Sequence, residues 1–179
     1  MSPSPFAGRD RAALRKHLSS YWKMEAGNLL LVPLIVWAMV WSAGDAPDAA
    51  MWLGAAACSF LLVVGTAAWL LVLAGLDGKP AQATRLVAFC ARAEIVSLLL
   101  VAATLAAASA VITGGWPPRT LAAAGLTLLS WLEYVNYYHW QLQNFDSQID
   151  AKRLVAGRGL RRAHMGRAVR AWRARRRRN

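Results

Sequence analysis

Acidic residues are scarce in this chain of 179 residues, which contains nine Asp and Glu against 21 Lys and Arg. No acid lies between Ala151 and Asn179, and no charged residue of either sign lies between Met51 and Leu76. Charged residues make up 17% of the chain, whereas a typical soluble domain contains about 25%. Hydrophobic residues make up 57%. This composition argues against a single soluble domain and predicts an integral membrane protein.

Alternation of polar and apolar residues at period two is also missing, which argues against an outer-membrane barrel. Long apolar runs separated by short loops predict instead an all-α protein. We expect a four-helix antiparallel transmembrane bundle, with spans at approximately 26–44, 51–76, 86–113 and 119–140. A span needs about 20 residues, and Pro117 and Pro118 prevent the last helix from starting earlier. The fourth span must therefore take Glu133 into the membrane.

The segments outside the predicted spans are polar and basic. Residues 1–25 are expected to form a cytoplasmic segment with a short amphipathic surface helix, because apolar residues share one face among basic ones: Leu14, Leu18, Tyr21 and Trp22. Residues 26–145 form the predicted transmembrane domain. Residues 146–179 form a basic cytoplasmic tail, which contains twelve Lys and Arg.

The distribution of basic residues predicts the orientation. They gather before the first span, in the loop that holds Lys79 and Arg85, and in the tail, whereas the other two loops hold only Arg119. By the positive-inside rule, both termini are cytoplasmic in a bacterial-type cytoplasmic membrane. The first span is short and carries Pro33, so a cleaved signal peptide is the alternative. The long polar segment before it favours a retained helix.

The common catalytic and cofactor motifs are absent. The chain has no GxxxxGK[ST], HExxH, CxxC or GxSxG pattern, and its three histidines fall in separate segments. We therefore expect no metal, no cofactor and no catalytic residue. Cys58 and Cys90 belong to different depths of neighbouring spans, so they are predicted to be packing residues rather than a disulfide.

A set of polar residues is predicted to meet in the cytoplasmic third of the bundle. Because neighbouring helices run antiparallel, the following residues of three helices are expected at that level: Glu25, Asn28, Arg92, Glu94, Glu133, Asn136 and Tyr137. One interpretation is a pocket open to the cytoplasm for an ion, a lipid headgroup or a proton. The other, which we favour, is a structural ion pair between Arg92 and Glu133, because pairing satisfies both buried charges.

The basic residues of the tail indicate which partner this protein binds. Met165, Val169 and Trp172 form an apolar stripe among arginines, which is typical of a helix on the inner leaflet surface. We expect anionic lipid headgroups to contact the basic residues of this region: Lys152, Arg153, Arg158, Arg161, Arg162, Arg167, Arg170 and Arg173. The simplest explanation of the charge is the topology signal itself, and nucleic acid is the least favoured partner.

The sequence thus predicts a small multi-pass membrane protein that is not an enzyme. It is expected to interact with anionic lipid, with a protein partner or with a second copy of itself through its basic cytoplasmic face. The alternative is a small transporter or membrane-embedded enzyme that uses the inner polar residues.

Overall fold

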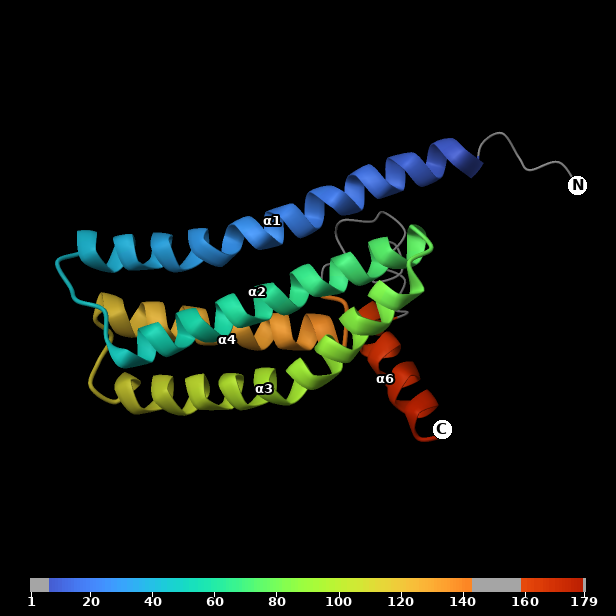
Figure 1. Cartoon of the computed structure of the whole chain (residues 1–179). Coiled ribbons are helices and arrows are strands. Elements are labelled where there is room, and N and C mark those ends of the chain that lie inside the picture. Colours follow the sequence, from blue (N-terminus) through green and yellow to red (C-terminus); the bar gives the residue numbers. More distant parts are fainter. Residues whose placement is uncertain (1–6, 143–158, 179) are drawn as a thin grey trace, which may run out of the picture.

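The computed structural model describes residues 7–142 and 159–178, and its regular elements are all helices. Figure 1 shows four of them running antiparallel, with the fifth lying against one end of the others. They are α1 (Ala7–Ser42), α2 (Ala49–Leu76), α3 (Pro80–Ile112), α4 (Pro118–Tyr138) and α6 (His164–Arg176). The start of α1, the α2–α3 turn and α6 lie at the same end, which we call the basic end.

Three of these helices are long and apolar enough to cross a membrane. They cover Ala12–Ser42, Ala49–Leu76 and Pro80–Ile112. Helix α4 is not among them, although it was predicted as the fourth span. Its 21 residues would rise about 31 Å, but its last two turns hold Glu133, Asn136 and tyrosines. The crossing of α4 stays a prediction.

An apolar belt surrounds the part of the bundle away from the basic end. Exposed large apolar side chains run from Met24 to Trp41 on α1, from Phe89 to Leu105 on α3, and from Leu121 to Leu132 on α4. Helix α3 has 33 residues and is about 50 Å long, whereas a hydrocarbon core is about 30 Å thick. The first turns of α3, before Phe89, therefore extend beyond the belt at the basic end.

Helix α2 is the centre of the bundle and packs against α1, α3 and α4. Its N-terminal half contributes Met51, Ala55 and Cys58 to one buried cluster with residues of α1 and α4. Its C-terminal half contributes Val64 and Leu71 to a second cluster, shared with α3, α4 and α6. The second cluster lies toward the basic end and positions the polar side chains described below.

The predicted surface helix is not a separate element. Helix α1 runs without a break through the expected boundary near residue 25, and its 36 residues include Pro33. The weakest helix former near that boundary is Gly27, and its cost of about 1 kcal/mol in a helix is too small to end the helix. An ion pair between Arg15 and Asp77 (3.1 Å) joins the first part of α1 to the α2–α3 turn.

The apolar stripe predicted to lie on the membrane is also placed differently. Met165 and Val169 are 3% and 1% exposed, and they pack with Trp172 into the cluster shared with α3 and α4. The stripe was interpreted from amphipathicity alone, and amphipathicity does not distinguish a lipid surface from a protein surface. In the structure, the protein covers it.

Candidate functional site

A buried hydrogen bond between two side chains joins α1 to α4. The hydroxyl group of Tyr137 donates a hydrogen bond of 3.0 Å to Oε1 of Glu25, which is only 5% exposed. Tyr137 reaches it across the backbone of α2 at Gly65, where a Cβ atom would overlap the tyrosine hydroxyl group. A glycine at position 65 is thus required for this contact.

A second carboxyl group lies close to this pair. Glu133 is one turn before Tyr137 on α4, is half-buried, and interacts electrostatically with Glu25. The Tyr137 hydroxyl group interacts with both carboxyl groups, while the buried Oε2 of Glu133 has no hydrogen-bond partner among the described residues. Within residues 7–142 and 159–178, no Lys or Arg forms an ion pair with either glutamate. We call these three residues the Glu–Tyr–Glu cluster.

The ion pair predicted between Arg92 and Glu133 is not formed. Arg92 is exposed on α3, and its neighbour Glu94 is held by α6 instead. The prediction placed both residues in the cytoplasmic third of the bundle, but it did not include the rotation of α3, which leaves the Arg92 side chain exposed. Asn28 is half-buried on α1 and makes no hydrogen bond to the cluster among the described residues.

A cavity of about 250 Å³ adjoins the cluster at the basic end. It is lined by α2, by the end of α4 and by the start of α6, through Ala68, Trp69, Val72, Asn136, Tyr137, Gln141, Ala163, His164 and Met165. The Trp69 ring stacks on Tyr21, with ring centroids 4.9 Å apart, and its buried Nε1 has no hydrogen-bond partner within the described part of the chain. Asn136 Oδ1 accepts a hydrogen bond of 2.8 Å from the N–H of Leu142, which fixes the chain as it leaves α4.

Helix α6 closes the basic end by docking on α4. Backbone hydrogen bonds join Gln141 N–H to the Arg161 carbonyl (2.9 Å) and Ala163 N–H to the His139 carbonyl (3.1 Å). The Tyr138 hydroxyl group donates to the Cys90 carbonyl at 3.0 Å, which holds α4 against α3 at the same level. The start of α6 is therefore part of the folded bundle.

Arg173 attaches α6 to α3. Its guanidinium group forms an ion pair of 2.6 Å with Glu94 and donates a hydrogen bond of 2.8 Å to the Ala91 carbonyl. Both partners lie just past Phe89, where the apolar belt begins on α3. The docked helix is therefore held at the edge of the belt on α3.

The residues predicted to contact lipid fall into three groups. Arg161, Arg162, Arg167 and Arg170 are exposed, as that role requires. Arg173 is half-buried and has a structural contact with α3. Lys152, Arg153 and Arg158 lie outside the described residues.

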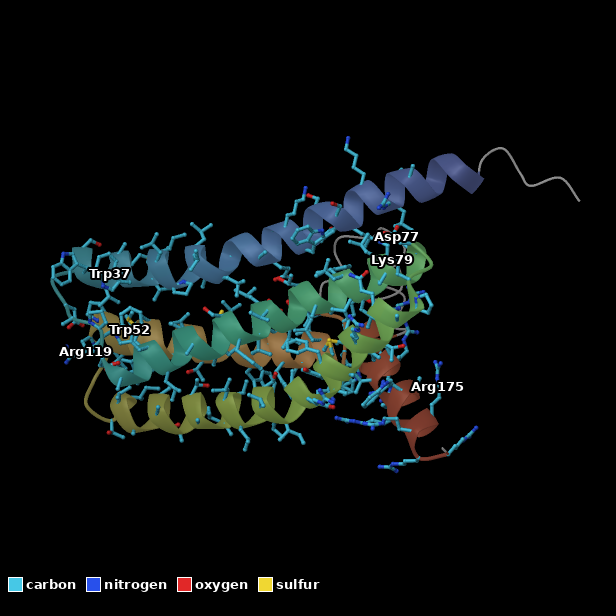
Figure 2. The ribbon with its side chains drawn as sticks, in the orientation of Figure 1. Trp37, Trp52, Asp77, Lys79, Arg119 and Arg175 are labelled. Carbon is cyan, nitrogen blue, oxygen red and sulfur yellow. The ribbon has the colours of Figure 1, made fainter. Side chains whose placement is uncertain are left out.

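The two ends of the bundle differ in charge, because most Lys and Arg residues lie at the basic end, whereas the other end holds Arg119 beside Asp45. Figure 2 shows Trp37, Trp52 and Arg119 at one end, and Asp77, Lys79 and Arg175 at the other. Arg119 forms an ion pair with Asp45 at the tryptophan-bearing end, and the Arg119 backbone N–H donates to the same carboxylate at 3.0 Å. These bonds hold the pKa of Asp45 below its usual value of 3.8.

Several residues of the site were missed by the sequence analysis. Neither Trp69 nor Tyr138 was selected as a candidate. Gly65 and Gly166 are the positions where α2 and α6 approach tyrosines of α4. A glycine inside an otherwise clean helix was the available signal, because it often marks a close backbone approach.

Comparison with family models, with curated proteins and with solved structures finds no match for the chain. Its class therefore follows from the structure: an all-helical protein with three helices suited to crossing a membrane. Among the residues that the structure describes, no group of three or more His, Cys, Asp and Glu is arranged to hold a metal ion.

Proposed function

We propose that this chain is a four-span protein of a bacterial-type cytoplasmic membrane that binds anionic lipid headgroups through its basic end. In this proposal α4 crosses the membrane together with the three more apolar helices, and both termini lie in the cytoplasm. Support comes from the basic residues at the start of α1, in the α2–α3 turn and on α6, which share one end of the bundle.

The observation that carries the proposal is the docking of α6. A basic segment that served only as a topology signal would need no fixed position. Here Gly166 contacts α4 and Arg173 contacts α3, which hold a helix without acidic residues at the edge of the apolar belt. Each basic residue near an anionic membrane surface contributes about 1 kcal/mol to binding.

Native mass spectrometry of the protein in neutral detergent tests the proposal. The sample contains equal amounts of phosphatidylglycerol and phosphatidylcholine. We expect the wild type to retain phosphatidylglycerol preferentially, and the preference to fall in high salt, which screens charge. The variant R161Q/R162Q/R167Q/R170Q should lose most of it. Equal retention by wild type and variant would contradict lipid binding by the docked helix and leave the charge a topology signal.

Topology is tested separately, in cells. A tag at the N-terminus and a tag at the C-terminus should both be protected from protease added outside, and the N-terminal tag should stay attached to the mature protein. If only the C-terminal tag is accessible to the protease, α4 does not cross the membrane. Loss of the N-terminal tag would indicate that the first helix is a cleaved signal.

A second candidate function rests on the Glu–Tyr–Glu cluster. Two carboxyl groups and a tyrosine hydroxyl group without an ion-pair partner among the described residues would suit a small transporter or membrane-embedded enzyme that binds a cation or a proton. Melting temperatures measured with Na⁺, K⁺ or methylammonium at constant ionic strength test it. Stabilisation of the wild type by one of these cations, absent from E25Q, would favour this function. If none of these cations changes the melting temperature of the wild type, this second candidate function is contradicted.

A further inference from the structure

One flank of α6 carries an unusual group of arginines. Arg170, Arg173 and Arg177 follow one another at spacings of three and four residues, so they lie on the same side of the helix. Together with Ala174 and Arg178 they line a shallow hollow of about 400 Å³. The apolar stripe of α6 lies beside this flank and is buried, so the hollow faces outward next to the contact with α3.

The position of this flank is determined by Arg173. Its bonds to Glu94 and to the Ala91 carbonyl fix the rotation of α6 about its own axis. Arg170 and Arg177 are exposed on either side of it, one turn away in each direction. In the described chain neither forms an ion pair, and Glu94 is the single acid that reaches this flank. The hollow therefore keeps an excess of positive charge.

We propose that this hollow, which we call the arginine hollow, binds a phosphate group that carries two negative charges or a pair of adjacent phosphates. Arginine presents a planar fork of donors that matches phosphate oxygens two at a time. Two exposed guanidinium groups flanking a third, fixed one suit a dianion better than the single charge of a phosphodiester. The inference deepens the proposed lipid binding and rests on it, since it names the headgroup class and the residues.

Two sources supply this chemistry, namely a lipid with a phosphomonoester headgroup and a soluble phosphate compound. The hollow lies on the helix that Arg173 holds at the edge of the apolar belt. A phosphate attached to acyl chains would reach it while its chains stay beside the belt. A soluble phosphate compound has no acyl chains and would gain no contribution from the apolar belt.

Phosphatidic acid is the probe for the first source, and glycerol 3-phosphate for the second. Binding of each to the full-length protein in neutral detergent is measured by native mass spectrometry and by microscale thermophoresis. The test variant is R170Q/R177Q, which keeps Arg173 and therefore the docking of α6. The matched control is R167Q/R175Q, which removes the same charge from exposed positions of the same helix outside the hollow. Circular dichroism and the melting temperature verify that both variants are folded.

We expect R170Q/R177Q to weaken phosphatidic acid binding about tenfold or more and R167Q/R175Q less than about threefold, because only the first pair removes direct phosphate contacts. Binding of phosphatidic acid without glycerol 3-phosphate identifies the source as lipid, and comparable binding of both identifies it as the phosphate alone. Equal losses in the two variants would overturn the arginine hollow while leaving general anionic-lipid binding intact. No preference of the wild type for any anionic lipid would overturn both.

Discussion

Gly166 of α6 lies directly against the backbone carbonyl group of Tyr138, at the end of α4. A Cβ atom at this position would overlap the carbonyl oxygen, and a backbone oxygen cannot move aside as a flexible side chain can. The contact allows the chain around Ala163 to bond to His139 and brings Met165 and Val169 into the core. The docking of the basic helix therefore depends on the absence of one side chain.

Replacing Gly166 with alanine should release α6 from the bundle. Trypsin cleavage after the arginines of α6 should become faster, and the free energy of unfolding should fall by about 1–3 kcal/mol, as in an overpacked core. Gly125→Ala is the control, because a Cβ atom there meets nothing within 4 Å. Unchanged trypsin cleavage of G166A would show that α6 is not docked through this contact.

Replacing Tyr137 with phenylalanine should destabilise the bundle by about 1–3 kcal/mol, because Glu25 loses its buried hydrogen-bond donor. Thermal unfolding in detergent measures the change. Tyr134 is buried on the same helix, and the described contacts include no hydrogen bond from its hydroxyl group, so Y134F is the control. Equal losses in both variants would mean that the Tyr137 hydroxyl group adds nothing specific.

Replacing Arg92 with glutamine should change the free energy of unfolding by no more than about 0.5 kcal/mol, as expected for an exposed position. Replacing Glu133 with glutamine should leave the melting temperature equal or higher, because the carboxyl group faces Glu25 without a cation among the described residues. A buried ion pair between Arg92 and Glu133 would instead give losses of about 3–5 kcal/mol for each variant. Thermal unfolding of the two single variants and the double variant decides between these outcomes.

Replacing Arg173 with lysine should loosen α6 although the charge is kept. A lysine ammonium group lacks the fork that reaches both Glu94 and the Ala91 carbonyl. Faster trypsin cleavage within α6 is the expected result, with little change in the melting of the other helices. The variant R175K is the control, and a reversed pair, E94R with R173E, should restore part of the protection.

Acid should weaken the connection between the α1–α2 loop and α4. The folded state holds the pKa of Asp45 low, chiefly through the backbone N–H of Arg119, so the unfolded chain binds the proton more readily. The stabilisation is complete above a pH of about 4 and is lost as the pH falls through the lowered pKa. The difference in melting temperature between wild type and D45N should shrink toward zero over that range. A difference independent of pH would assign the effect to something other than ionisation.

Much of the fold was predictable because apolar runs and breaks determine helices in a membrane. The predicted span at 51–76 agrees with α2 to within two residues, since Asp48 caps its start and Asp77-Gly78 follows its end. The end of α1 was predicted equally well. Its start was not, because the change from basic to apolar residues near Glu25 marks a change of environment and not of secondary structure.

The sequence allowed the level of the site residues along the bundle to be predicted, but not the directions in which their side chains point. Placing Glu25, Glu133 and Tyr137 at one level needed only counting along antiparallel helices, and the structure does bring them together. Assigning Arg92 as the partner needed the rotation of α3 about its axis, and the sequence places Arg92 and Glu94 two residues apart without showing which of them faces α4. The docking of α6 was also not predictable, because it depends on a glycine whose role appears only when α4 is beside it.

The hydrogen bond between Glu25 and Tyr137 joins residues 112 positions apart, which has a consequence for synthesis. A ribosome adds about 5–20 residues per second, so roughly 6–22 s pass between the appearance of the two residues. During that interval α1 already exists while the donor for its carboxyl group does not. Glu25 lies next to Met24, where the apolar belt begins on α1, so water at the membrane boundary can solvate it until the last helix of the bundle arrives.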